Sequence, residues 1–278
     1  MSFTLEMIVI GGLTGILSGL LGVGGGFIMI PLLNAAGLLM REAVGLSLLY
    51  VVFTATSATL RHCKIGTVDP VLALILLGGA TPMAVVGSYY ATVLPNNVLE
   101  IAFALLAIGA TATYLGRGRG KDGAPAKSFA RPDAIPRYRH ILLRRRRVKN
   151  EELFFTINIF SGLLLGGCLG IVAGLLGIGG GWLLVPLLVL VMRIPIQIAV
   201  GTSLLAILGP AVAGAATHWK FGNFDLKISI PLILAGIIGA QIGAILVARI
   251  PSIWLERLLV FLLIGVSIYI LAQGLGFL

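Results

Sequence analysis

The stretch that decides the fold of this chain reads Gly19-Leu-Leu-Gly-Val-Gly-Gly-Gly-Phe-Ile-Met-Ile-Pro-Leu-Leu33. The same pattern returns 155 residues later, where residues 174–188 read Gly-Leu-Leu-Gly-Ile-Gly-Gly-Gly-Trp-Leu-Leu-Val-Pro-Leu-Leu. A glycine inside a helix costs about 1 kcal/mol relative to alanine. A dense glycine run in both halves of the chain therefore indicates that bare backbone is needed at two equivalent places.

The composition indicates an integral membrane protein. The 278 residues are 58% hydrophobic and 11% charged, whereas a soluble domain carries about 25% charged residues. We therefore expect an all-α, polytopic membrane protein.

Apolar segments follow one another in the same order in the two halves of the chain. They lie at roughly 5–21, 27–40, 43–60, 69–93 and 97–116, and again at 152–175, 182–193, 197–217, 226–248 and 252–275. Further matches support a duplication, such as His62-Cys-Lys-Ile-Gly-Thr-Val-Asp69 with His218-Trp-Lys-Phe-Gly-Asn-Phe-Asp225. We expect a first transmembrane repeat at 1–116, a basic linker at 117–150 and a second transmembrane repeat at 151–278.

Glycines four residues apart precede each glycine run. Spacing of four places them on one helix face, where another helix backbone can approach closely in lipid. We interpret them as packing residues: Gly11, Gly15 and Gly19, and Gly162, Gly166, Gly170 and Gly174.

The segments at 27–40 and 182–193 are too short for an ordinary crossing, since each reaches about 20 Å against a hydrocarbon core of about 30 Å. Joined to the helix before it, each would be too long for one crossing. The pattern favours discontinuous helices broken at the glycines inside the membrane. Five crossings per half would make the repeats inverted, and four would make them parallel. The distribution of Lys and Arg does not separate the two, and termini without Lys or Arg favour the inverted arrangement.

All of the excess positive charge lies in one loop. Residues 117–150 hold twelve Lys or Arg and two Asp, which gives +10, and the rest of the chain holds eight of each sign, which sums to zero. Such a loop is expected on the cytoplasmic side. Anionic lipid recognition by the arginines at 144–147 is the alternative.

The glycine breaks are the best candidates for a binding site. The helix after each break presents free N–H groups and the positive end of its dipole, which together favour an anion. Two such ends can converge on one anion, as in secondary transporters, and the alternative is a tight turn without a ligand. The residues concerned are Gly24, Gly25 and Gly26 with Gly179, Gly180 and Gly181.

Hydroxyl groups follow in the next segment, where Ser47 aligns with Ser203 and Thr202 lies beside the latter. They are candidate substrate ligands, although hydroxyls in membrane helices often bond to backbone or neighbouring helices. The matched His62 and His218 lie at the ends of apolar segments. They are candidates for a proton relay, or ordinary interfacial residues.

Several classes of function lack their motifs. The sequence contains no GxxxxGK[ST], HExxH or GxSxG, and the two cysteines lack metal-ligand spacing. We therefore expect no enzymatic activity, no cofactor, no metal and no nucleic-acid partner.

In its repeated segments the chain resembles the TauE/SafE family of sulfite exporters. The resemblance covers both glycine stretches with Pro31 and Pro186, Ala199-Val-Gly-Thr-Ser203, and the segment from His218 to Asp225. Leu46 stands opposite Thr202, and Cys63 opposite Trp219, so the two halves differ chemically. The resemblance implies transport of sulfite, sulfonates or related organosulfur anions.

We therefore expect a secondary transporter of a small sulfur-containing anion that works by alternating access between two repeats. The expected location is a cell membrane, in bacteria the inner one, with the lipid bilayer as a partner and a homodimer left open. A passive anion channel and a non-transporting membrane scaffold are the alternatives.

Overall fold

The computed structural model describes most of the chain apart from the loop after the first repeat and the C-terminal segment. The described residues are 2–95, 98–99, 101–102, 105, 109, 141–148, 151–177, 179, 181–222, 226–247, 249–251, 254–255, 257–258, 261–262 and 264–265. The apolar segments expected at 97–116 and 252–275 therefore fall largely outside the described residues.

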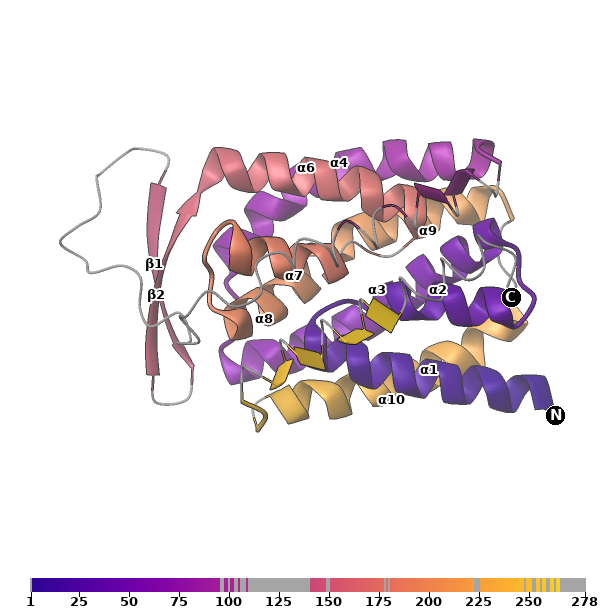
Figure 1. The fold of residues 1–278 in the computed structure, drawn as a ribbon, viewed down its shortest axis with the longest axis horizontal. Coiled ribbons are helices and arrows are strands. Elements are labelled where there is room, and N and C mark those ends of the chain that lie inside the picture. Colours follow the sequence, from indigo (N-terminus) through magenta and orange to yellow (C-terminus); the bar gives the residue numbers. More distant parts are fainter. Residues whose placement is uncertain are drawn as a thin grey trace.

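The elements follow the expected order of the two repeats (Figure 1). The first half contains α1 (Ser2–Leu21), α2 (Gly26–Ala35), α3 (Met40–Ile65) and α4 (Pro70–Val93). The second half contains α6 (Ile159–Leu176), α7 (Gly181–Leu190), α8 (Ile196–Ala206), α9 (Leu208–Lys220) and α10 (Leu226–Val247). Strands β1 (Ile141–Val148) and β2 (Glu151–Asn158) lie between them.

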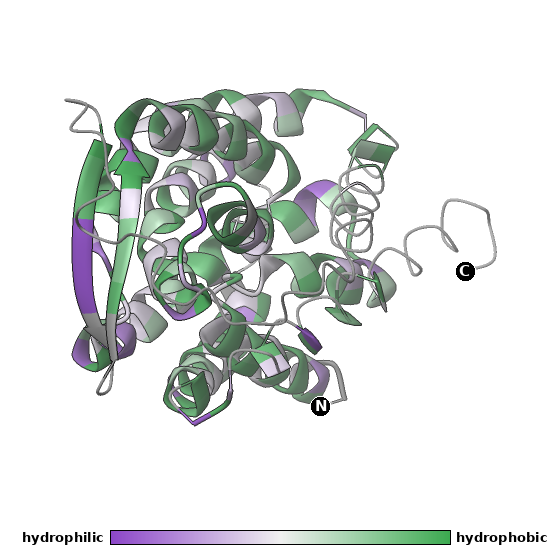
Figure 2. Cartoon of the chain, turned by 60° about the vertical axis from the view of Figure 1, so that its left-hand side comes forward, coloured by the Kyte–Doolittle hydropathy of each residue, from purple (hydrophilic) through white to green (hydrophobic). Residues whose placement is uncertain are grey.

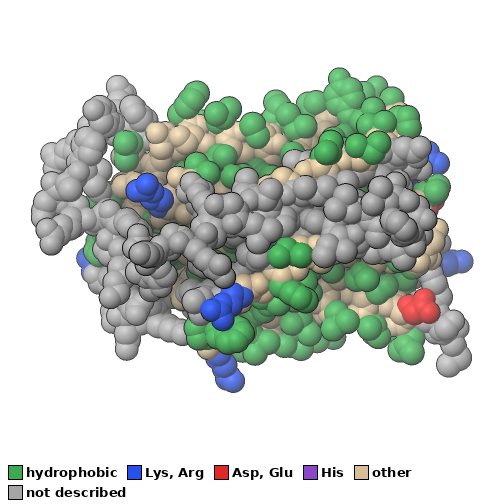
Figure 3. Space-filling model, in the orientation of Figure 1, with side chains coloured by type: hydrophobic (Ala, Val, Ile, Leu, Met, Phe, Trp, Pro, Cys, Tyr) green, Lys and Arg blue, Asp and Glu red, His purple; other side chains and the backbone are tan. Residues whose placement is uncertain are grey.

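The predicted helical membrane fold is confirmed. Six helical stretches of the described chain are long and apolar enough to cross a membrane: Thr4–Leu21, Met40–Ile65, Pro70–Val93, Ile159–Leu176, Ile196–Lys220 and Lys227–Val247. Hydrophobic residues dominate most of these helices (Figure 2), and hydrophobic side chains cover the flanks of the bundle (Figure 3). This surface suits contact with lipid.

The discontinuous helices are also present. The backbone leaves the helical conformation between α1 and α2, and again between α6 and α7. The two short helices have ten residues each, about 15 Å at 1.5 Å per residue, which is half of a membrane crossing.

Within the described part of the chain, a β-hairpin is the regular element that the sequence analysis did not anticipate. Strands β1 and β2 pair antiparallel, from Ile141 opposite Asn158 to Val148 opposite Glu151. Part of the expected basic linker is therefore a strand, and the apolar segment expected from residue 152 begins as a strand too. The helix α6 starts only at Ile159, because the Asn158 side chain accepts hydrogen bonds from the N–H groups of Phe160 and Ser161 and caps it.

The first helix of each repeat packs against a late helix of the other, α1 on α10 and α6 on α4. The glycine faces make both contacts backbone to backbone. A side chain at Gly15 would meet the backbone of Gly236, and one at Gly170 would meet the backbone of Ala80. These two contacts are repeat-matched, so the predicted duplication extends to the packing.

We expect Gly15→Ala to lower the thermal stability of the protein in detergent. The added methyl group would meet the α10 backbone, and overpacking of this kind costs about 1–3 kcal/mol. Gly12→Ala on the same helix is the matched control, because a Cβ at Gly12 meets nothing within 4 Å. Equal melting temperatures for the two variants would contradict the packing role of the glycine face.

Candidate functional site

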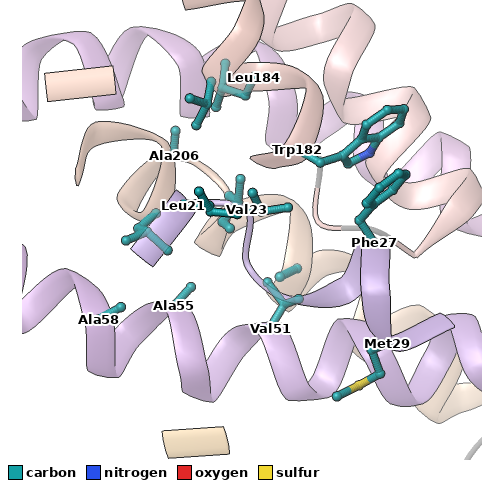
Figure 4. Packing of buried hydrophobic residues seen from close by; sticks show 14 of the residues in the cluster. Leu21, Val23, Phe27, Met29, Val51, Ala55, Ala58, Trp182, Leu184 and Ala206 are labelled. Carbon is teal, nitrogen blue, oxygen red and sulfur yellow. The ribbon is translucent and has the colours of Figure 1, made fainter. Parts of the chain in front are cut away.

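The two glycine breaks meet in the centre of the protein. A Cβ at Gly181 would approach the carbonyl groups of Gly22 and Val23, so the start of α7 lies against the first break. Directly after the breaks, the rings of Phe27 and Trp182 stack with centroids 4.4 Å apart and planes 13° apart (Figure 4). These two aromatic residues occupy the same position in the two repeats, so they mark where the repeats face each other.

The backbone within the breaks explains the glycines. Gly24 has φ 79° and Gly179 has φ 69°, a left-handed conformation that other residues adopt only with strain. Both glycines also face Val51, which would meet a Cβ at either position. Space and conformation therefore both require glycine at these points.

The residues beside the two breaks are buried and mainly apolar. Val51 and Trp182 are fully buried, and so are Gly26 and Gly181, the first residues of α2 and α7. A cavity of about 10 Å³, about the space of one water molecule, lies on one side of Gly179 among residues of α4, α6, α7, α8 and α9. The described helix starts are therefore covered by protein in this conformation.

Ser47 and Ser203 connect the repeats across the breaks. The Ser203 hydroxyl donates to the Gly22 carbonyl at 2.8 Å and to the carbonyl of Val200 at 2.9 Å. The matched Ser47 hydroxyl donates to the carbonyl of Gly177. Both predicted substrate-binding serines thus lie at the breaks. In this conformation their hydroxyl groups donate hydrogen bonds to backbone carbonyls of the opposite repeat.

The other predicted residues have separate positions. Gly25 and Gly26 form the N-cap and first residue of α2, while Gly180 lies outside the described residues. Thr202 accepts a hydrogen bond from the backbone N–H of Asp69 at 2.9 Å. It therefore contacts the α3–α4 turn and not the break itself.

The two histidines are buried near the ends of their helices. His62 joins the end of α1 to the α3–α4 turn, because its Nε2 atom lies 3.0 Å from the Gly19 carbonyl and its Nδ1 atom 2.8 Å from the Thr67 hydroxyl. His218 lies in the last turn of α9. Their predicted role in a proton relay stays a prediction.

The sequence analysis missed a polar cluster beside the first break. The Tyr50 hydroxyl donates to the carbonyl of Gly11 at 2.6 Å and lies 2.9 Å from the hydroxyl of Thr14. A Cβ at Gly25 would meet both the Tyr50 ring and Ser18. The repeat-matched positions are apolar, namely Leu169, Ala173 and Ala206. A comparison of the aligned halves for unmatched hydroxyls would have found this asymmetry.

The analysis also missed an ion-pair cluster at Asp69, whose carboxylate is fully buried. Its Oδ2 atom accepts from the Nε atoms of Arg144 at 3.1 Å and of Arg146 at 3.0 Å, and its Oδ1 atom caps α4 through the N–H of Leu72. The hairpin is thereby fixed to the α3–α4 turn, which in turn contacts Thr202 of the second repeat.

The pKa of Asp69 reflects two opposing effects. Burial alone would raise it, but the Leu72 N–H and the guanidinium groups of Arg146 and Arg144 outweigh burial and hold the pKa below its usual value. The carboxylate is therefore charged at neutral pH. The signal for this site was the matched Asp69 and Asp225, but its partners came from a basic run that was interpreted as a topology signal or a lipid-binding group.

The geometry defines the class of protein. Membrane-length helices and two broken helices that meet in the core are features of membrane transporters. Among the described residues, no three His, Cys, Asp or Glu side chains are grouped so that they could bind a metal ion.

The chain belongs to the TauE/SafE family of sulfite exporters, whose family model, described as "Sulfite exporter TauE/SafE", matches residues 7–270. It is therefore a multi-pass membrane transporter of this family. No solved structure gives a significant match to the chain.

Curated relatives agree with this assignment. The chain is 26% identical to "Probable membrane transporter protein YunE" of Bacillus subtilis, over 99% of both chains. It is 29% identical to a "Probable membrane transporter protein" of Xylella fastidiosa, over 94% of this chain and 92% of the relative. A relative from Methanocaldococcus jannaschii, "Probable membrane transporter protein MJ0441", is 26% identical over 85% of each chain. These names describe membrane transporters.

We expect Asp69→Asn to lower the stability at pH 7 by about 1.5–3 kcal/mol, the range for hydrogen bonds to a charged group. Asparagine still caps a helix, so the substitution removes mainly the charge. Because the folded pKa is depressed, the stabilisation is present above the unfolded value of about 3.9 and disappears as the pH falls through the folded pKa. Thermal unfolding in detergent from pH 7 downward measures this difference.

Arg144→Gln should reproduce part of the loss, whereas Arg145→Gln should not. Arg145 is the matched control, since it lies next to Arg144 on β1 and is placed over the Phe154 ring at 5.8 Å. A difference between wild type and Asp69→Asn that stays constant down to pH 3 would contradict the ion-pair assignment.

Proposed function

We propose that this protein is a secondary transporter of small sulfur-containing anions, namely sulfite, a sulfonate or a related organosulfur anion. The observation that carries the proposal is the meeting of the two glycine breaks, which places the starts of α2 and α7 in the centre of the protein. Helix starts bind anions through unpaired N–H groups and the helix dipole. The family assignment supports the sulfur chemistry of the substrate.

We further propose alternating access between two inverted repeats. The matched contacts of the glycine faces join the two repeats, with α1 parallel to α10 and α6 parallel to α4. Gly11 and Gly19 face Leu232 and Ala240 in that order. The opposite courses of α1 and α6 in Figure 1 support the inversion.

In this mechanism the buried helix starts and the buried Phe27–Trp182 pair represent the occluded arrangement. To admit an anion, the Phe27–Trp182 stack separates and the hydroxyls of Ser47 and Ser203 leave the opposite carbonyls. The freed hydroxyls can then donate to the anion together with the helix starts. Each hydroxyl exchanges a hydrogen bond to a backbone carbonyl for a hydrogen bond to the anion. Because the free energies of these two bonds are similar, the change between states costs little.

The orientation follows from charge. We place the basic loop at 117–150 and the adjoining hairpin on the cytoplasmic side of a cell membrane, in bacteria the inner membrane, because Lys and Arg accumulate in cytoplasmic loops.

Sulfite flux in proteoliposomes with an imposed pH gradient tests the proposal. We expect saturable, gradient-dependent flux that Gly25→Ala reduces by about tenfold or more, the loss expected when one donor to a bound charge is misplaced. Gly25 has φ 84°, so alanine distorts the start of α2. Ser203→Ala is a milder second variant, and Gly12→Ala is the control with a free Cβ.

Three outcomes would contradict parts of the proposal. Flux that rises linearly with sulfite and ignores the gradient indicates a channel. No flux of any organosulfur anion by the folded protein removes the transport assignment. Normal flux in both Gly25→Ala and Ser203→Ala places the binding site away from the breaks.

A further inference from the structure

A second cavity lies at the base of the hairpin, separate from the glycine breaks. It measures about 310 Å³, near the lower limit of known small-molecule sites. Polar and apolar residues line it in equal number among those that the structure describes: Ile141, Phe155, Thr156, Asn158, Ser161, Val191, Met192 and Arg193. The start of α6 and the turn after α7 enclose it, so it lies where helices of membrane length meet the polar boundary.

Arg193 has an unusual backbone in this cavity. Its φ of 54° makes it the one residue other than glycine with a positive φ among the described residues. The matched turn of the first repeat has Gly37 in the same conformation, with φ 94°. Both residues lie three positions before the next helix, α3 or α8.

The fold of this turn therefore favours glycine, and the second repeat has an arginine instead. Left-handed backbone at residues other than glycine is strained and is concentrated at functional sites. The strain has no packing explanation here, because the Arg193 side chain is exposed. Its charge is the property that glycine lacks.

The electrostatics of the cavity favour an anion. No described residue forms an ion pair with Arg193, and none of the eight residues of the lining is acidic. Ser161 adds a hydroxyl, and the start of the 18-residue helix α6 adds the positive end of its dipole. Val191, Met192 and Phe155 provide an apolar wall beside these groups.

We propose that this cavity binds a small oxyanion group. The Arg193 guanidinium is its principal binding group, and the Ser161 hydroxyl is a second hydrogen-bond donor. The same chemistry is presented by the phosphate of an anionic phospholipid head group and by a free anion in solution. In the lipid case the apolar wall faces the first carbons of the acyl chains. This site is independent of the proposed anion site at the breaks.

The test compares binding by wild type, Arg193→Gly and Arg249→Gly. Native mass spectrometry measures retention of phosphatidylglycerol against phosphatidylcholine. Isothermal titration in detergent without added lipid measures sulfite and inorganic phosphate. We expect Arg193→Gly to weaken binding of at least one anionic probe by about tenfold or more. Arg249→Gly removes an exposed arginine that does not line the cavity, and it should bind as wild type.

The glycine substitution also separates binding from folding. Because glycine relieves the left-handed strain, Arg193→Gly should melt at the same temperature as ligand-free wild type or higher. Arg193→Gln, which keeps the strain but removes the charge, should lose binding equally. Loss confined to phosphatidylglycerol identifies a lipid site, and loss confined to sulfite or phosphate identifies a site for free anions. Unchanged binding of every probe in both variants, or no binding by wild type, overturns the proposal.

Discussion

The close approach of helix backbones along the glycine faces is the constraint on which the rest of the structure depends. Lipid offers no hydrophobic gain for bringing two apolar helices together, so their association relies on close packing. Glycines on α1 and α6 allow backbone contact with α10 and α4. Since each contact joins a helix of one repeat to a helix of the other, neither repeat is complete alone. The exchange then brings the ends of α1 and α6, and with them the two glycine breaks, into the centre.

Polar contacts secure what the glycine faces position. The Ser203 hydroxyl bonds to the first break, and its neighbour Thr202 bonds to the N–H of Asp69. Asp69 in turn accepts from Arg144 and Arg146 of the hairpin. A continuous series of contacts thus leads from the polar end of the protein to the buried break. The hairpin and the first break are therefore linked through α8 by hydrogen bonds.

The sequence predicted what depends on backbone and missed what depends on long-range side-chain partners. The broken helices and the packing glycines were predictable, because no other residue suits a left-handed turn or a backbone contact. Ser47 and Ser203 were placed at the breaks, but not their bonds to the opposite repeat, since a hydroxyl has many partners in reach. Strand β1 was missed because its four arginines obscure any alternation of apolar and polar residues. For Asp69, charge alone did not reveal which of twelve loop cations would meet it.

Duplication determines the backbone of both halves alike, and the side chains then make them different. The cluster of Tyr50, Thr14 and Ser18 beside the first break has only Ala206, Leu169 and Ala173 in the second. The matched turns differ in the same way, with Gly37 in one and Arg193 in the other. Each difference adds a polar or charged group to one side of a pair whose geometry is shared. These unmatched groups show where the two halves present different chemistry.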